Sequence, residues 1–228
     1  MRLEAAPFVP AASDDAEAIL RTVLPSRRTA LVSSFGADSA VLLHMVSRID
    51  AETPVVFVDT EMLFAETLAY QRDLAARLGL RDVRRVTPDR AAVFGRDGDG
   101  LLHRRDPDAC CTLRKVEPLE RALEGFDAWI TGRRRHQAGR GALRAFERAG
   151  GRTKVNPLAH WPRERVAHYL DAHDLPRHPL TQRGFASLGC APCTSAVRPD
   201  EDERAGRWRG RGKTECGIHF ENGKAVRA

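Results

Sequence analysis

Five cysteines carry the first chemical signal in this 228-residue chain. Cys110 and Cys111 are adjacent, and Cys190 and Cys193 form a C-x-x-C. Two such pairs provide four thiolates, enough for Zn²⁺ or an iron–sulfur cluster. Adjacent cysteines diverge on a helix, which suits the separate irons of a cubane better than one tetrahedral ion. The spacing therefore favours a [4Fe–4S] cluster over zinc, and a redox C-x-x-C or buried structural thiols are the alternatives.

The fifth cysteine, Cys216, lies near the C-terminal end in "KTECGIHF". A thiolate is a nucleophile, and nearby cations lower the pKa of a thiol. Lys213 and three arginines precede Cys216 within nine residues, and His219 follows it. This setting favours catalysis over a chance surface thiol.

Two cationic strips supply further candidates. Residues 131–146 hold five arginines and no acid, and residues 204–213 hold four arginines and a lysine. The arginine fork suits phosphate and sulfate because it donates two parallel hydrogen bonds. Lys115 lies one helical turn after Cys111, so it is expected to point toward the cluster and an anion site together. Solvated surface and nucleic-acid binding are the alternatives.

A small-residue loop, "SSFGADS" (33–39), joins a predicted strand to a predicted helix. Gly36 permits a tight turn, and free amides at the start of the helix favour an anion. The loop is neither a Walker motif nor G-x-G-x-x-G, and an ordinary turn with Asp38 or Ser39 at the helix cap is the alternative. Asp59 and Thr60 end the next predicted strand and are expected to face the same crevice if the two strands pair, and a helix cap is the alternative role of Asp59.

Alternating strands and helices must position these groups. Apolar runs without alternation predict strands, and helical periodicity predicts the segments between them, which implies a parallel sheet covered on both faces. Such sheets bind ligands beyond the carboxyl ends of their strands. We predict one α/β domain over 1–197 and a flexible catalytic tail over 198–228. The predicted strands are 29–35, 53–60, 82–88, 126–132 and 153–161, and the predicted helices are 37–49, 62–79, 111–125 and 162–173.

Composition narrows the class of protein. The formal net charge of +6 indicates an anionic partner, either a small phosphorylated ligand or nucleic acid. No apolar run is long enough for a membrane span, and acids occupy the place of a secretory apolar segment. We therefore expect a cytoplasmic protein without a membrane partner, whose cysteines bind metal or react.

Six motifs in this order resemble the adenylyl-sulfate/phosphoadenylyl-sulfate reductase family, from Ser33 to Phe220. The family often has glycine where this chain has Glu61, and leucine where it has Ile218. The tail is also shorter and lacks the tryptophan cluster of many relatives. The motifs are "SSFGADS", "FVDTEMLFAET", "CCTLRKVEPL", "TGRRRHQ", "GCAPCT" and "KTECGIH".

The resemblance implies a Rossmann-like parallel sheet flanked by helices, of the adenine nucleotide alpha hydrolase type. Members with both cysteine pairs are similar to iron–sulfur enzymes that prefer adenylyl sulfate (APS). The implied reaction is thioredoxin-dependent reduction of APS to sulfite and AMP in sulfate assimilation and cysteine biosynthesis. The implied ligands of a [4Fe–4S] cluster are Cys110, Cys111, Cys190 and Cys193.

The resemblance also implies residue roles. Cys216 attacks the sulfur of APS, AMP departs, and thioredoxin releases sulfite from the resulting S-sulfocysteine. No nucleic acid is expected, and a homo-oligomer is left open. The implied substrate-binding residues are Ser33, Ser34, Phe35, Gly36, Ser39, Thr60, Lys115, Gly132, Arg140, Arg204, Arg207 and His219.

Three alternatives remain open at this point. One is a reductase of the 3′-phosphorylated substrate (PAPS), because rejection of a 3′-phosphate depends on the shape of the pocket. The second is an iron–sulfur enzyme of tRNA thiolation that splits ATP at the α-phosphate. The third is a zinc-stabilised nucleic-acid-binding module. The E-C-G-I-H tail has no role in the tRNA-thiolation enzyme.

Overall fold

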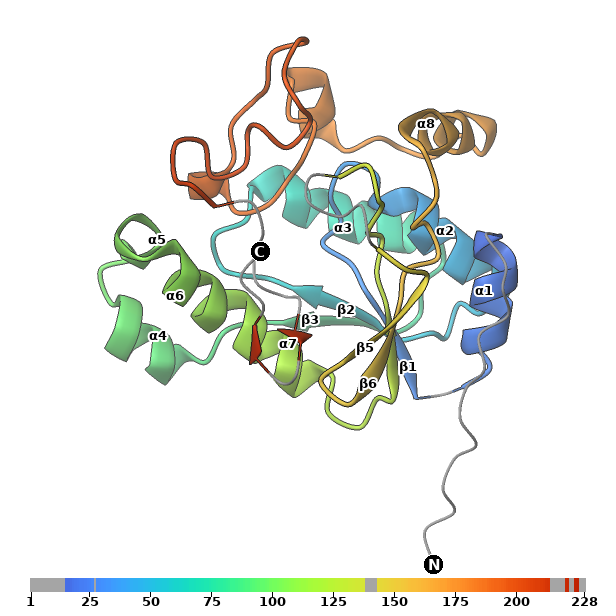
Figure 1. Cartoon of the computed structure of the whole chain (residues 1–228), viewed down its shortest axis with the longest axis horizontal. Coiled ribbons are helices and arrows are strands. Elements are labelled where there is room, and N and C mark those ends of the chain that lie inside the picture. Colours follow the sequence, from blue (N-terminus) through green and yellow to red (C-terminus); the bar gives the residue numbers. More distant parts are fainter. Residues whose placement is uncertain (1–14, 27, 138–142, 214–219, 222–223, 226–228) are drawn as a thin grey trace, which may run out of the picture.

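The architecture is a six-stranded sheet flanked by helices (Figure 1). The computed structural model describes residues 15–26, 28–137, 143–213, 220–221 and 224–225. The strand order is β3-β2-β1-β4-β6-β5, with β5 antiparallel to β6 and the other pairs parallel. A separate hairpin joins β7 (Phe220–Glu221) to β8 (Lys224–Ala225). The strands of the main sheet are β1 (Thr29–Val32), β2 (Val55–Val58), β3 (Val83–Val86), β4 (Ala128–Ile130), β5 (Phe146–Ala149) and β6 (Arg152–Val155).

Helices cover the sheet on both faces, as the apolar strand patterns predict. In β1, Leu31 packs into a large core with α1, α2, α3 and α8, whereas Ala30 packs into a smaller core with α7. In β2, Phe57 and Val56 divide between the same two cores. Figure 1 shows α2 and α3 on one side of the sheet and α7 on the other. The α-helices are α1 (Ala16–Val23), α2 (Ser39–Ile49), α3 (Ala65–Arg77), α4 (Arg90–Asp97), α5 (Leu102–Arg105), α6 (Pro107–Cys111), α7 (Glu117–Ala122) and α8 (Arg163–Ala172).

Two predicted elements differ from the structure. The predicted helix over 111–125 is divided into α6, a π-helical turn η1 (Thr112–Val116) and α7. The predicted strand over 153–161 is the short β6, because Pro157 lacks the N–H that a ladder needs. Its antiparallel partner β5 has the polar sequence "FERA", which is typical of an edge strand and gave no apolar signal.

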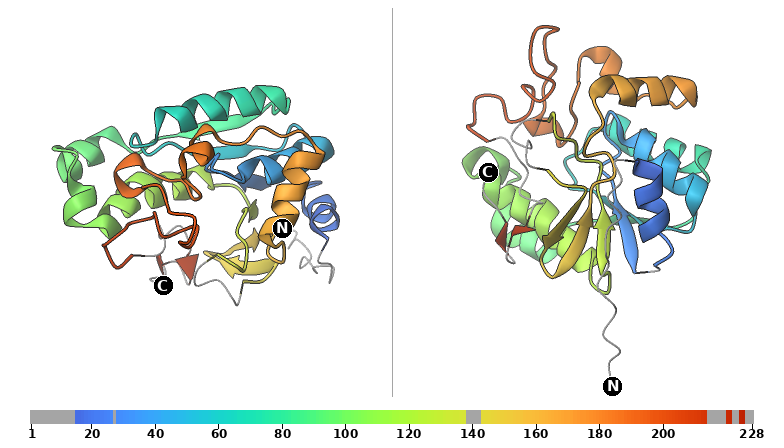
Figure 2. Two further views of the ribbon diagram at one scale, coloured as in Figure 1. Left: turned by 90° about the horizontal axis from the view of Figure 1, so that it is seen from above. Right: turned by 45° about the vertical axis from the view of Figure 1, so that its right-hand side comes forward.

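The segment from Arg198 to Lys213 contains no helix or strand of the sheet, but it packs beside the C-x-x-C. Ser195 N–H donates to Gly206 O at 2.9 Å, and Trp208 N–H donates to Cys193 O at 3.0 Å. Two short 3₁₀ turns precede it, η2 (Pro179–Arg183) and η3 (Ala191–Cys193). Figure 2 shows this orange-to-red part of the chain on the same side of the molecule as α5 and α6.

The predicted boundary between 197 and 198 stays a prediction, since residues 214–219 lie outside the described part of the chain. Among the described helices, none has the length and apolar character that a membrane span requires.

Candidate active site

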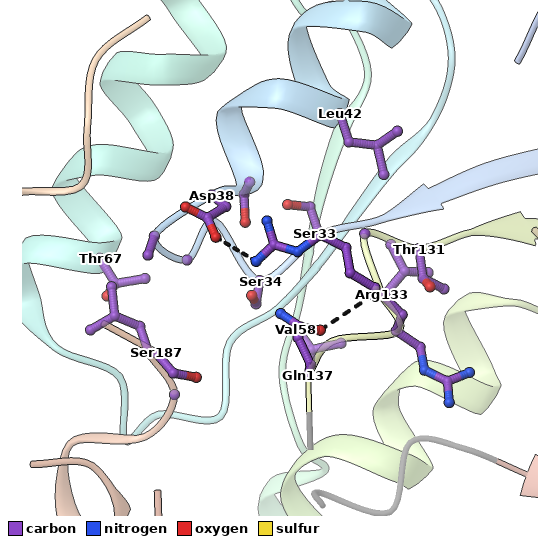
Figure 3. Close-up of a pocket in the computed structure, with 18 of the residues that line it drawn as sticks. Ser33, Ser34, Asp38, Leu42, Val58, Thr67, Thr131, Arg133, Gln137 and Ser187 are labelled. Carbon is purple, nitrogen blue, oxygen red and sulfur yellow. Dashed lines mark hydrogen bonds and ion pairs between the residues drawn. The ribbon is translucent and has the colours of Figure 1, made fainter. Parts of the chain in front are cut away.

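The carboxyl ends of β1, β2 and β4 open into a cavity of about 270 Å³ (Figure 3). Ser33, Ser34 and Gly36 line it from the loop after β1, and Gly132 lines it from the loop after β4. Lys115 of the turn between α6 and α7 also lines it, as do Glu203, Arg204, Arg207 and Trp208 near the C-terminal end. This is the edge at which open parallel sheets bind ligands.

Phe35 anchors the loop after β1. Its side chain is fully buried and meets the ring of Phe57 edge-on, with 5.3 Å between centroids. Its backbone is left-handed, with φ 48°, and its N–H donates to Ser33 Oγ at 3.2 Å. The side chain therefore faces the core, and its neighbours Ser34 and Gly36 face the cavity.

The start of α2 is held by an ion pair rather than by a side-chain cap. Asp38 occupies the N-cap position, but its carboxylate makes no capping bond. Instead, Arg134 Nη2 donates to Asp38 Oδ2 at 2.6 Å. Both residues line the cavity beside Ser39, and Arg134 is only 2% exposed. The arginine-rich strip is evident in the sequence, but the role of Arg134 is not, because Asp38 and Arg134 are far apart in sequence.

Of the two polar residues that follow β2, one is buried within the fold and the other lines the cavity. Asp59 is buried, where it accepts from Arg85 Nε at 2.8 Å and from Glu61 N–H at 2.9 Å. The expected approach of Asp59 to the crevice is therefore wrong, because Arg85 and the turn use its carboxylate. Thr60 does line the cavity, and its hydroxyl lies 3.2 Å from Cys190 Sγ.

Glu61 departs from the pattern of the family without entering the cavity. It has φ 58°, a conformation that favours glycine, and its Oε2 lies 3.8 Å from Arg114 Nη1. Arg114 is buried, where its Nε donates to Asp97 Oδ2 at 2.9 Å and its Nη1 donates to Thr60 O at 3.0 Å. These contacts join the end of β2 to η1.

The two cysteine pairs face a second, smaller cavity. Cys110 and Cys111 reach it from α6, and Cys190 and Cys193 reach it from the segment around η3. Ala191 N–H donates to Met62 O at 2.7 Å, which fixes the C-x-x-C beside the loop after β2. Four thiols on one cavity, drawn from two segments, fit the donor set of a thiolate-ligated cluster.

The electrostatics of this cavity follow from burial and from like charges. Burial raises the pKa of Cys110 to about 12, and the negative charges of Cys111 and Cys190 add to the shift. Burial also raises the pKa of Cys193, against the opposing charge of Arg211. Within the described ranges, no three His, Cys, Asp or Glu side chains are arranged to hold a metal ion. The cluster therefore stays a prediction.

The two cavities share a wall. Lys115 and Trp208 line both of them. Arg204 and Arg207 line the larger cavity, and Arg207 Nη1 donates to Leu188 O at 2.6 Å with its guanidinium 4.4 Å above the Trp208 ring. Three predicted site residues lie outside the described part of the chain: Arg140, Cys216 and His219.

Most of the arginines that the structure describes in the cationic strips have partners within the chain. Arg133 Nη1 donates to Glu147 at 3.0 Å, and Arg209 Nη1 donates to Glu201 at 2.8 Å. Arg211 Nη1 donates to His103 O at 2.6 Å. Internal pairing of this kind argues against an open basic surface for nucleic acid.

Sequence comparison gives close relatives over most of the chain. An adenosine 5′-phosphosulfate reductase of Mesorhizobium japonicum is 53% identical over 84% of this chain and 76% of its own length. A similarly named protein of Deinococcus radiodurans is 44% identical over 90% of this chain and 81% of its own. A phosphoadenosine 5′-phosphosulfate reductase of Gloeobacter violaceus is 41% identical over 83% of this chain and 81% of its own.

Solved structures confirm the predicted fold. The phosphoadenylyl-sulfate reductase of Candida auris superposes with a TM-score of 0.68, covering 80% of this chain and 90% of its own, at 28% identity. The FMN adenylyltransferase of Candida glabrata, at 17% identity and a TM-score of 0.56, shares the fold alone. Residues 28–196 match the phosphoadenosine phosphosulfate reductase domain, well over half of the chain. This protein therefore belongs to the phosphoadenosine phosphosulfate reductase family.

Proposed function

We propose that this chain reduces adenylyl sulfate to sulfite and AMP in sulfate assimilation, the route to cysteine. The observation that carries the proposal is the larger cavity. It is lined by a serine-rich loop and by the cationic side chains of Lys115, Arg204 and Arg207, and it shares Lys115 and Trp208 with the cavity of the four thiols. The relatives from Mesorhizobium and Deinococcus carry the name of this activity.

The cavity suits the two halves of the proposed substrate differently. Ser33, Ser34 and Gly36 lie at the apolar strand ends, where adenosine would bind. Lys115, Arg204 and Arg207 would bind the phosphosulfate. Cations are required there because negative charge grows on the phosphate oxygen as the S–O bond breaks.

Cys216 is the proposed nucleophile. Its thiolate attacks the sulfur of APS, a new S–S bond forms, the S–O bond breaks, and AMP leaves with the electron pair. One thiolate of thioredoxin then attacks Cys216 Sγ and releases sulfite. The second thiol of thioredoxin resolves the mixed disulfide, so that thioredoxin supplies both electrons and is oxidised. The proposed compartment is the cytoplasm. His219 would orient the tail or bind the sulfonate.

A [4Fe–4S] cluster held by Cys110, Cys111, Cys190 and Cys193 is part of the proposal. Such a cluster would tie α6 to the C-x-x-C segment and fix Lys115 between the two cavities. Hydroxyl and guanidinium donors lie close to two of the sulfurs, with Arg211 Nη1 3.8 Å from Cys193 Sγ. No electron of the proposed reaction passes through the cluster.

Sulfite release from anaerobically purified protein tests the function. With thioredoxin present, APS should yield sulfite and AMP in equal amounts. Cys216→Ser should bind APS but release no sulfite and form no sulfonated protein by mass spectrometry. A labelled adduct on Cys216→Ser, or no sulfite from wild-type protein with either nucleotide, would refute the proposal.

Reduction of PAPS is the second candidate. The relative from Gloeobacter and the structure from Candida auris carry that name. The same assay decides between the two, because the better substrate has the larger kcat/KM.

A further inference from the structure

Two acidic residues contribute to the described lining of the larger cavity, Asp38 and Glu203. They differ in their partners. Asp38, labelled in Figure 3, accepts a 2.6 Å hydrogen bond from buried Arg134, and both residues line the cavity. Glu203 has looser contacts, with Oε1 3.6 Å from His136 Nε2 and Oε2 3.9 Å from Arg163 Nε. An acid in a cavity for a polyanion needs an explanation, and Asp38 is the more firmly held.

Arg134 has a donor without an acceptor. Its side chain is 3% exposed, one of its amino groups contacts Asp38, and its Nε has no hydrogen-bond partner among the described residues. A buried charged donor left without an acceptor costs free energy. Because Arg134 lines the cavity, a bound ligand is the natural source of that acceptor.

The pair has the chemical properties of a hydroxyl-binding site. Its charges cancel, and it offers a carboxylate acceptor beside a guanidinium donor. A hydroxyl group satisfies both, because it donates one hydrogen bond and accepts others. A phosphate monoester at the same place would bring negative charge up to the carboxylate, and at neutral pH it has mostly lost the proton that it could donate. Lys115, Arg204 and Arg207 line the same cavity and supply the positive charge that a phosphosulfate needs.

We propose that Asp38 and Arg134 form a subsite for the ribose 3′-hydroxyl of the nucleotide, and that Asp38 excludes a 3′-phosphate. The subsite rests on the proposed function, because it assigns part of the same cavity to the sugar. It makes the chain select APS over PAPS. Asp38 accepts from the hydroxyl, and Arg134 donates to it.

Calorimetric binding of unreactive nucleotides tests the subsite. Wild-type protein should bind AMP more tightly than adenosine 3′,5′-bisphosphate. Asp38→Asn keeps the size of the side chain and removes its charge, so it should narrow that preference by roughly tenfold or more. Replacing AMP with 3′-deoxy-AMP should weaken binding to wild type and matter less to Asp38→Asn. For wild-type protein, replacing AMP with 2′-deoxy-AMP should weaken binding less than replacing it with 3′-deoxy-AMP does.

Glu203→Gln is the matched control, because it removes the other carboxylate of the lining. It should leave the ratio of the two affinities unchanged. If Glu203→Gln narrows the ratio of the AMP and bisphosphate affinities as much as Asp38→Asn does, the overall electrostatic field of the cavity discriminates between the two nucleotides. The proposed subsite is then wrong. If Asp38→Asn weakens both nucleotides in equal proportion, the pair serves structure or phosphate binding and the subsite is again wrong. A stronger loss with 2′-deoxy-AMP than with 3′-deoxy-AMP would also overturn it.

Arg134→Lys guards against a folding defect. It keeps the charge but cannot hold Asp38 and a ligand with one planar fork. We expect it to lose the dependence on the 3′-hydroxyl while its thermal unfolding stays cooperative; an unchanged dependence would contradict the role of Arg134. These nucleotides do not react, so the outcome is independent of Cys216 and thioredoxin. Normal AMP binding without sulfite release would refute the proposed function alone.

Discussion

His178 shows how one buried side chain ties stability to pH. It is fully buried, its Nδ1 accepts from Leu180 N–H at 3.2 Å, and its Nε2 lies 3.1 Å from Thr67 Oγ1. This arrangement requires the neutral imidazole, with its proton on Nε2. Burial lowers the pKa of His178 to about 4, and the nearby charge of Glu66 opposes the shift only in part.

The free energy of unfolding should therefore fall in acid. Well above pH 6.5 the imidazole is neutral in both the folded and the unfolded state, and its contribution to stability is complete. As the pH falls from about 6.5 to 4, the unfolded chain binds a proton that the folded chain refuses, which costs up to about 3 kcal/mol. Urea titrations at several pH values should show this loss, reduced in His178→Asn but not in His168→Asn, which changes an exposed residue. Equal pH profiles for wild type and His178→Asn would contradict the assignment.

Gly189 leaves room for the guanidinium of Arg207. A Cβ at Gly189 would lie 2.2 Å from Arg207 Nη2, closer than real Cβ atoms approach. Gly189→Ala should displace the guanidinium from the cavity and raise the KM for APS by about tenfold, the cost of a lost charge-assisted hydrogen bond. Thermal unfolding should change little, because the end of a flexible side chain can move. Gly95→Ala, where a Cβ meets nothing within 4 Å, should leave KM unchanged; a similar rise in both variants would sink the explanation.

At the scale of elements, a buried ion pair joins α4 to η1. The side chain of Asp97 is fully buried, it accepts from Arg114 Nε at 2.9 Å, and it also accepts from Leu102 N–H at 2.7 Å. Arg114 in turn donates to Thr60 O at 3.0 Å. One charged pair therefore fixes the start of α5, the π-helical turn and the end of β2.

Removing one partner should leave the other charge buried and uncompensated. We expect Asp97→Asn to lower the free energy of unfolding by about 3 kcal/mol. Denaturant titration measures the change, with Asp99→Asn as control, since Asp99 pairs with Arg105 at the surface and should matter little. Similar free energies of unfolding for wild type and Asp97→Asn would show that the ion pair of Asp97 and Arg114 does not stabilise the fold.

The elements differ in how well sequence predicts them. Strands such as β2, "VVFV", are apolar on both faces because helices cover both faces, and this pattern was sufficient to predict them. β5 is a polar edge strand, so its sequence lacks that pattern. Short helices such as α4 lack enough turns to give a clear period.

The site divides in the same way. Thiols, serines and glycines in short motifs indicate their chemistry directly. The cysteine pairs and the loop over 33–39 could therefore be predicted as site residues from the sequence. Contacts over long sequence separations could not be predicted in this way. The neighbouring sequence does not indicate that Arg134 pairs with Asp38 or that the side chain of Phe35 is buried in the core. It also does not indicate that Arg85 donates a hydrogen bond to Asp59.

At the scale of the whole molecule, the two cavities form one unit. The thiol cavity meets α6 and the C-x-x-C segment, and the larger cavity meets the sheet edge. The segment from Arg198 to Lys213 connects them through the Trp208 N–H to Cys193 O bond. A substitution of one of these cysteines should therefore weaken nucleotide binding in the larger cavity.

Cys193→Ser should show that coupling. We expect it to lose bound iron, measured by elemental analysis, and to bind AMP several-fold more weakly, because Trp208 and Arg207 lose their support. Cys216→Ser should retain both iron and AMP affinity. Full iron content in Cys193→Ser would contradict the proposed cluster, and unchanged AMP affinity after loss of iron would contradict the coupling.

The shared wall also gives the molecule a built-in optical reporter. The chain has three tryptophans, of which Trp129 and Trp208 line the larger cavity, while Trp161 is buried in the core with α8. Trp208 also lines the thiol cavity, where a coloured metal group would quench its emission. Intrinsic fluorescence should thus follow nucleotide binding through Trp129 and metal occupancy through Trp208, without any label.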